Sequence, residues 1–124
     1  MEQTRAHELA VTAQRARILA MDMVHTAGSG HIGGSLSVMD LLTTLYFHTM
    51  RIDPKQPADP GRDRFVLSKG HAAAVTSFSQ AAIGCYAVED IYKEYATDFG
   101  RFGMHSCNLA NPYVDVSTGS LGHG

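Results

Sequence analysis

The sequence predicts the first part of an α/β protein, in which helices flank a parallel sheet, and three observations support this fold class. Residues 5–26 and 38–50 carry the apolar spacing of helices. Residues 64–68 form a short apolar run typical of a buried parallel strand. A segment of small residues follows this run at once, as in a strand–helix unit. Because a single strand cannot make a sheet, we expect residues 1–124 to be one incomplete domain.

Glycines separate the first two predicted helices. Residues 5–26 place an apolar stripe at three- and four-residue steps, formed by Leu9, Ala13, Ala16, Ala20 and Val24. Gly28 is expected to end this helix. The second helix, residues 38–50, is apolar on most sides and is therefore expected to be buried, with Ser35 or Ser37 as its cap.

The rest of the chain alternates loops with two further helices. A proline-rich surface loop, residues 51–63, leads to the predicted strand. The small-residue helix after the strand is expected to end at Gly84. A short amphipathic helix follows, with Glu89 and Asp90 in its first turn, where the helix dipole favours acids. From residue 97 onward, the glycine, asparagine and serine content predicts loops.

The composition excludes several classes of function. The net charge of −2 shows no excess of basic residues of the kind that binds nucleic acid. No apolar run approaches the ~20 residues of a membrane span. The first residues lack a basic-then-apolar signal pattern, so we expect a cytoplasmic protein with no membrane partner. Cys85 and Cys107 lack paired spacing and are expected to be free thiols.

Three glycines near residue 30 match the dinucleotide pattern G-x-G-x-x-G, namely Gly28, Gly30 and Gly33, with His31 between them. In a dinucleotide site the glycines follow a strand and open a helix. Here they follow a predicted helix, which argues against a dinucleotide site. We instead expect the glycines to take positive φ angles and to hold His31 at a cleft.

Two more of the seven histidines occupy positions typical of a site. His71, in "SKGHA", follows the predicted strand, where open α/β sheets bind ligands; the alternative is a helix cap. His105 lies in the polar loop "RFGMHSCN", and the alternative is a surface residue. The glycines of residues 117–124 leave the backbone bare for a flat ligand, or form a flexible terminus. The remaining histidines that we expect at the surface are His7, His25 and His48.

Common zinc-site and serine-nucleophile motifs are missing from the sequence. No histidine or cysteine spacing fits a zinc site, so no metal ligands are expected in this chain. No G-x-S-x-G nucleophile motif occurs either.

Four motifs in order resemble the N-terminal part of transketolases: "SGHIGGSLSVMDLLTTLYF", "DRFVLSKGHAA", the His105 loop and "VDVSTGSLGHG". The resemblance is closest to the N-terminal subunit of two-chain transketolases and covers nearly the whole chain. It implies the diphosphate module of thiamine-diphosphate enzymes as the fold, with thiamine diphosphate and Mg²⁺ or Ca²⁺ as cofactors. It also implies transfer of a two-carbon ketol unit from a ketose phosphate to an aldose.

The same resemblance implies roles for individual residues. His31, His71 and His105 correspond to catalytic histidines, with His31 beside the substrate carbonyl and His71 between cofactor and substrate. The backbone of Gly119, Ser120 and Leu121 corresponds to the segment that contacts the aminopyrimidine. Two alternatives remain. One is a sister enzyme with the same cofactor, such as a deoxyxylulose-phosphate synthase or an oxo-acid dehydrogenase component. The other is a non-catalytic remnant that binds partner subunits.

The sequence also departs from the family pattern. Met104 and Ser106 flank His105 where glycine and proline are common, Ile32 stands where one-chain members tend to have proline, and His123 replaces the usual glutamine. The family's Gly-Asp-Gly metal motif and its pyrimidine-activating glutamate would lie beyond residue 124. We therefore expect metal ligands outside this chain, a C-terminal subunit or further chain segments as partner, a homo-oligomer, and sugar-phosphate substrates.

Overall fold

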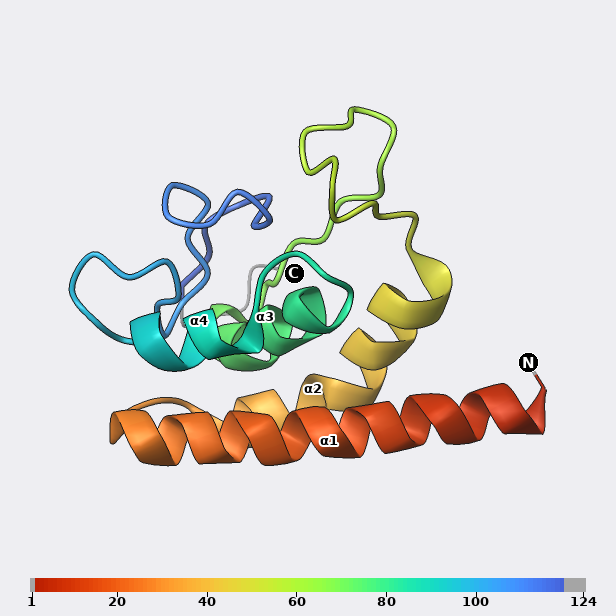
Figure 1. Cartoon of the computed structure of the whole chain (residues 1–124), viewed down its shortest axis with the longest axis horizontal. Coiled ribbons are helices and arrows are strands. Elements are labelled where there is room, and N and C mark those ends of the chain that lie inside the picture. Colours follow the sequence, from red (N-terminus) through yellow and green to blue (C-terminus); the bar gives the residue numbers. More distant parts are fainter. Residues whose placement is uncertain (1, 120–124) are drawn as a thin grey trace.

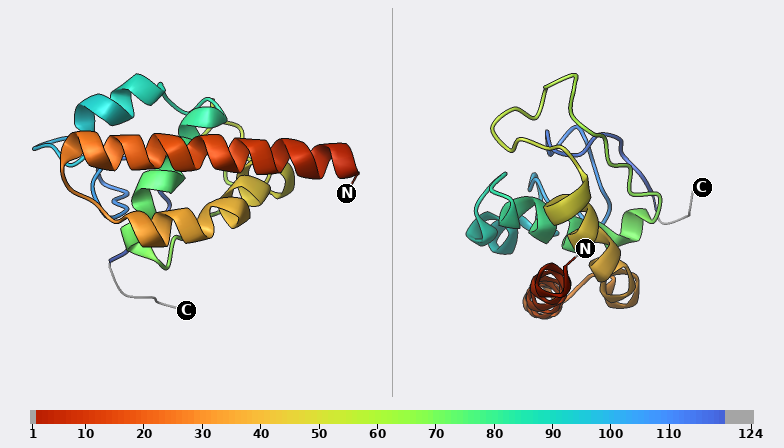
Figure 2. Two further views of the ribbon diagram at one scale, coloured as in Figure 1. Left: turned by 90° about the horizontal axis from the view of Figure 1, so that it is seen from below. Right: turned by 90° about the vertical axis from the view of Figure 1, so that its right-hand side faces the viewer.

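The computed structural model describes residues 2–119, in which the regular structure is helical throughout (Figure 1). Its α-helices are α1 (Gln3–Ala27), α2 (Ile32–Thr44), α3 (Ala73–Ala82) and α4 (Val88–Glu94). A π-helical turn, η1 (Leu45–Thr49), continues α2, and a 3₁₀ turn, η2 (Gly70–Ala72), precedes α3. The long α1 and the returning α2 lie on one side of the molecule, and the loops rise on the other side (Figure 2).

The first helix forms as predicted and ends where predicted. Gly28 takes a left-handed conformation (φ 68°), and its N–H donates to the carbonyl of His25 at 3.2 Å. The buried face of α1 comes from the predicted stripe, extended by Met23. Arg17 fixes the neighbouring helix by donating from Nε to the carbonyl of Leu36 at 3.2 Å.

The predicted start of the second helix is wrong, because α2 begins at Ile32 rather than at residue 38. Neither candidate cap is used. The N-cap is His31, and the hydroxyl of Ser35 donates from inside the helix to the carbonyl of His31 at 2.8 Å. Packing of the buried Met39 and Leu42 therefore outweighs the weak helix propensity of the glycine pair that precedes them.

The parallel sheet predicted from residues 64–68 is not seen, because residues 2–119 contain no strand. A strand is defined by hydrogen bonds to a second strand, and no second strand is present in this part of the chain. The segment is held by other contacts. The N–H of Phe65 donates to the carboxylate of Asp115 at 2.8 Å, and Leu67 is buried in the core.

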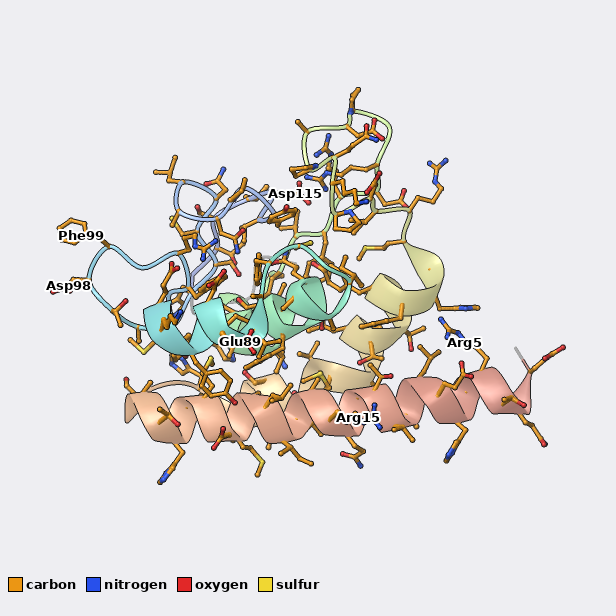
Figure 3. The ribbon with its side chains drawn as sticks, in the orientation of Figure 1. Arg5, Arg15, Glu89, Asp98, Phe99 and Asp115 are labelled. Carbon is orange, nitrogen blue, oxygen red and sulfur yellow. The ribbon has the colours of Figure 1, made fainter. Side chains whose placement is uncertain are left out.

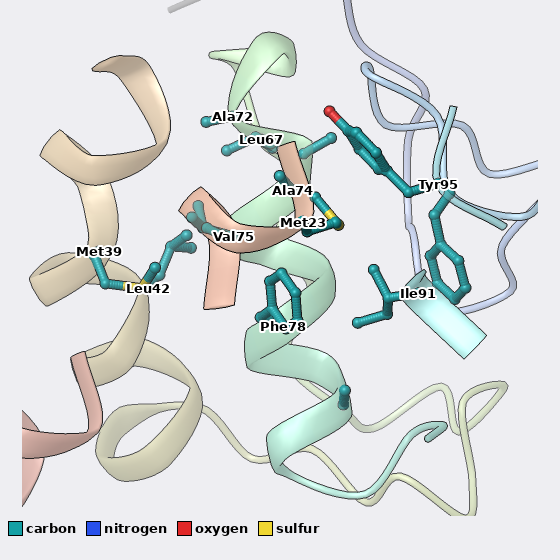
Figure 4. Packing of buried hydrophobic residues seen from close by; sticks show 14 of the residues in the cluster. Met23, Met39, Leu42, Leu67, Ala72, Ala74, Val75, Phe78, Ile91 and Tyr95 are labelled. Carbon is teal, nitrogen blue, oxygen red and sulfur yellow. The ribbon is translucent and has the colours of Figure 1, made fainter. Parts of the chain in front are cut away.

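The small-residue helix α3 forms the centre of the core, with residues 73–81 all buried. Phe78 and Val75 pack against Met23 of α1 and Ile91 of α4 (Figure 4). Small side chains let neighbouring helices approach α3 closely on several sides. The helix ends before Gly84 (φ 101°), and α4 carries its acidic first turn as predicted.

Candidate active site

Three histidines from distant parts of the sequence lie together in the fold. His31 precedes α2, His71 lies in η2, and His105 belongs to the loop after α4. The His31 ring centroid lies 5.5 Å from that of His71 and 5.4 Å from that of His105, with edge-to-face geometry in both pairs. The structure thus brings all three predicted site histidines to one place. The histidines expected at the surface, His7, His25 and His48, are exposed along α1 and η1.

The turn that presents His31 depends on two glycines. Gly28 and Gly30 have φ angles of 68° and 147°, in the region that favours glycine, whereas Gly33 lies inside α2. A Cβ on Gly30 would come within 2.7 Å of the hydroxyl oxygen of Tyr95. Tyr95 is buried directly after α4, and its hydroxyl packs against the turn that presents His31. Sequence patterns give no sign of Tyr95, because only the fold brings it to Gly30.

Gly34 makes room for His71. A Cβ at Gly34 would lie 2.7 Å from Nε2 of His71, so any side chain there would displace the imidazole. Lys69 ties the same turn to α2, because its Nζ donates to the hydroxyl of Ser37 at 3.0 Å. The second glycine of the "GG" pair was the available sequence signal, but its role depends on a neighbour 37 residues away in the chain.

The last described residues lie against the turn that carries His71. A Cβ on Gly70 would come within 2.0 Å of the carbonyl oxygen of Gly119, so the two backbones are in direct contact. The N–H of Thr118 donates to the carbonyl of Ser106 at 3.1 Å, which ties this segment to the His105 loop. Two other predicted cofactor contacts, Ser120 and Leu121, and also His123, lie outside the described residues.

His105 is half-buried rather than a surface residue. Its Nε2 atom is buried and has no hydrogen-bond partner among residues 2–119. The buried hydroxyl of Thr118 is also without a partner in that part of the chain. Buried polar atoms are costly when unpaired, so each of these two atoms is expected to have a polar partner in the functional protein.

An ion pair holds the loops of the site in register. Arg62 and Arg64 both contact the carboxylate of Asp115, and the side chains of Arg62 and Asp115 are about nine-tenths buried. Burial acts to raise the pKa of Asp115, but the hydrogen bonds from Arg62 and from the Phe65 N–H outweigh burial and lower that pKa. This ion pair joins the segment before Gly70 to the segment before Gly119, whose backbones are in contact at the two glycines.

The two free thiols differ, because backbone hydrogen bonds from Ala110 and Leu109 lower the pKa of Cys107. Burial raises the pKa of the free thiol of Cys85 to about 11, so it is a poor nucleophile. Within residues 2–119, no cluster of three or more histidine, cysteine, aspartate or glutamate side chains is arranged to hold a metal ion. No described helix combines the length and apolar character needed to cross a membrane.

Comparison with known proteins identifies the family. Residues 7–124 match the family described as "Transketolase, thiamine diphosphate binding domain". The chain belongs to this family. It is 37% identical over 119 residues to one subunit of the apulose-4-phosphate transketolase of Phocaeicola vulgatus, covering 94% of this chain and 41% of that protein. It is 38% identical over 109 residues to the 6-deoxy-6-sulfo-D-fructose transketolase subunit SqwG of a Clostridium species, covering 87% of this chain and 39% of that protein.

Longer transketolases share the same part of the fold. Human transketolase is 35% identical over 125 residues, covering 99% of this chain and 19% of the human protein. The structure of transketolase from Leishmania mexicana superposes with a TM-score of 0.84 at 30% identity, covering 90% of this chain and 17% of that one. The chain therefore spans about two fifths of the length of the two subunits and about a fifth of the longer enzymes.

The described residues fit one part of thiamine diphosphate. The space beside Gly119, where a Cβ would meet nothing within 4 Å, suits the close approach of a flat ring to the backbone. The adjacent imidazoles of His31 and His105 suit hydroxyl and carbonyl groups of a sugar. The metal that would bind the diphosphate needs oxygen ligands such as carboxylates, and residues 2–119 do not group three or more acidic, histidine or cysteine side chains for it.

Proposed function

We propose that this chain is one component of a thiamine-diphosphate-dependent transketolase, which transfers a two-carbon ketol unit from a ketose phosphate to an aldose. The observation that carries the proposal is the convergence of His71 and His105 on His31, with ring centroids 5.5 and 5.4 Å from that of His31, beside the bare backbone of Gly119. Imidazoles suit this reaction, because an imidazole ring can donate hydrogen bonds and can accept or release a proton.

Each residue would have a distinct task. Bound thiamine diphosphate supplies the carbanion and the electron sink for carbon–carbon cleavage. His31 and His105 would donate hydrogen bonds to substrate hydroxyls and to the oxygen on which negative charge develops. His71 would lie between cofactor and substrate, where it can hold or move a proton. The backbone of Gly119, Ser120 and Leu121 would hold the aminopyrimidine, with the Gly119 carbonyl accepting a hydrogen bond from its amino group.

The proposal includes partners and a metal. We infer that Mg²⁺ or Ca²⁺ is held by residues outside this chain, either in a C-terminal subunit or in further segments of a longer polypeptide. The names of two relatives, which are described as subunits of transketolases, support a multi-subunit enzyme. We also infer that residues 64–68 join a parallel sheet once those segments are present, and that the assembly is a homo-oligomer of such units acting on sugar phosphates.

The proposed function is tested by ketol transfer in the reconstituted enzyme. The chain is combined with the polypeptide that carries the remaining transketolase segments, and transfer from a ketose phosphate to an aldose is assayed with thiamine diphosphate and Mg²⁺. His71→Ala is expected to lower kcat/KM by roughly 10²- to 10⁴-fold, the usual contribution of a general acid or base. His7→Ala and His48→Ala, at exposed positions away from the three rings, are the matched controls and are expected to leave turnover unchanged.

Two results would count against the proposal. Equal turnover in His71→Ala and in the controls would remove His71 from the mechanism. Calorimetry that detects no thiamine diphosphate binding, with or without the partner polypeptide, would instead favour a role restricted to holding partner polypeptides together.

A further inference from the structure

A small polar cavity lies between α3 and the loop that carries His105. The volume that the centre of a water molecule can occupy in this cavity is about 10 Å³, which is enough for one water. Thr76 of α3 and His105 both line it, from opposite elements. Both also carry a buried polar atom, Oγ1 of Thr76 and Nε2 of His105, that has no hydrogen-bond partner among residues 2–119.

Thr76 differs from the other hydroxyl residues of α3. Ser77 donates to the carbonyl of Ala73 at 3.2 Å, and Ser79 donates to that of Val75 at 3.0 Å, so each bonds within the helix. Thr76 makes no such bond, although its side chain is only 4% exposed. Its hydroxyl therefore remains available to a group in the cavity.

The two longest polar side chains around the cavity, Gln80 and Arg101, are already engaged. The Gln80 amide donates to the carbonyl of Tyr113 at 2.9 Å, and its oxygen accepts from the Tyr86 hydroxyl at 2.7 Å. Arg101 is bound to Asp90 and Glu94 at 3.1 and 2.7 Å. The unpaired atoms of Thr76 and His105 thus have one simple common partner, which is a molecule in the cavity that both donates and accepts.

We propose that one buried water bridges Thr76 Oγ1 to His105 Nε2, and that Thr76 is thereby a positioning residue for His105. A water fits because the cavity is polar, has the required size and offers at least two partners. By engaging Nε2, the bridge restrains the plane of the ring and shifts the balance between its two tautomers, and so influences what the rest of the imidazole presents toward His31. The importance of this orientation for ketol transfer rests on the proposed function, whereas the bridge itself does not.

The first test needs no substitution. A high-resolution crystal structure of the reconstituted enzyme is expected to show an ordered water within hydrogen-bond distance, about 2.7–3.2 Å, of both Thr76 Oγ1 and His105 Nε2. A dry cavity, or a protein group that satisfies either atom in place of water, would overturn the proposal whether or not the enzyme is active.

The second test separates positioning from packing. Thr76→Val keeps the shape of the side chain and removes the hydroxyl, while Thr76→Ser keeps the hydroxyl. Thr43→Val is the matched control, because Thr43 is equally buried and has an unpartnered hydroxyl but does not line this cavity. The ¹⁵N shifts of histidine-labelled protein report the tautomer ratio of His105.

Thr76→Val is expected to change the His105 tautomer ratio and to lower kcat about tenfold, while the KM for the cofactor stays unchanged. Thr76→Ser is expected to have a tautomer ratio and a kcat close to those of wild type. Thr43→Val is expected to change neither quantity. A His105 signal that is the same in Thr76→Val and wild type would contradict the inference. A changed signal without an effect on turnover would keep the bridge and remove His105 from the proposed function.

Discussion

At the scale of single residues, the site depends as much on missing side chains as on the histidines. Gly34 and Gly70 are the positions at which a Cβ would meet His71 and the carbonyl of Gly119, respectively. The sequence singled out His31, His71 and His105, which the fold brings together, because each lies in a recognisable motif. It could not predict the contacts of Gly34, Tyr95 or Thr76, since their partners are distant in the chain and meet them only in the folded state.

Gly34→Ala tests this dependence directly. Alanine is the better helix former, so α2 is expected to stay folded and its thermal midpoint to remain equal or to rise. The new Cβ would lie 2.7 Å from Nε2 of His71, so the imidazole must move, and kcat/KM is expected to fall about 10²-fold.

The neighbouring glycine supplies the control. A Cβ at Gly33 meets nothing within 4 Å, so Gly33→Ala adds the same methyl group to the same helix without touching His71. Equal activity losses in the two variants would show that backbone effects, rather than the His71 contact, explain the result.

At the scale of elements, helices were easier to predict than their starts or the strand. The apolar stripe of α1 and the small residues of α3 are local signals, and both helices form. The start of α2 was missed because packing of Met39 and Leu42 overrides the glycines before them. Residues 64–68 need a partner strand, so their local pattern alone could not decide their structure.

Asp115 links two of these elements, and its contribution to stability should depend on pH. The pKa of Asp115 is lowered in the fold below its ordinary value of 3.8, so the charged form stabilises the folded state above about pH 4. This contribution is lost as the pH falls through the lowered value. Asp115→Asn is therefore expected to reduce the free energy of unfolding by roughly 2 kcal/mol at pH 7 and to approach wild type as the pH falls below that lowered pKa.

Chemical denaturation of the two proteins at a series of pH values measures this difference. Asp98→Asn is the control, because Asp98 lies exposed at the outer loop and forms no salt bridge among residues 2–119 (Figure 3). A difference between Asp115→Asn and wild type that stays constant from pH 7 to pH 2 would exclude the charge of Asp115 as its cause.

At the scale of the whole molecule, residues 2–119 leave large apolar side chains uncovered. Phe99 and Leu109 are almost completely exposed on the loops, as Figure 3 shows for Phe99, and Ile18 and Leu41 are exposed on the helices. Clusters of such residues commonly mark contact surfaces. The sequence indicated an incomplete sheet, but it could not show which apolar residues the fold would leave exposed.

The chain studied alone is therefore expected to self-associate, and its melting is expected to sharpen and to move to higher temperature when the partner polypeptide is added. Analytical ultracentrifugation and thermal scans, with and without the partner, measure both effects. A monodisperse monomer with a cooperative transition that the partner does not change would contradict this expectation.

The central claim is that the histidines act as one site, and a double-mutant cycle tests it most directly. His31→Ala, His71→Ala and the double variant are compared by kcat/KM for ketol transfer in the reconstituted enzyme. Because residues that act as a unit lose most of their effect together, the double variant is expected to be only slightly worse than the poorer single variant. A double variant whose loss equals the product of the two single losses would show that His31 and His71 act independently, and would contradict the claim.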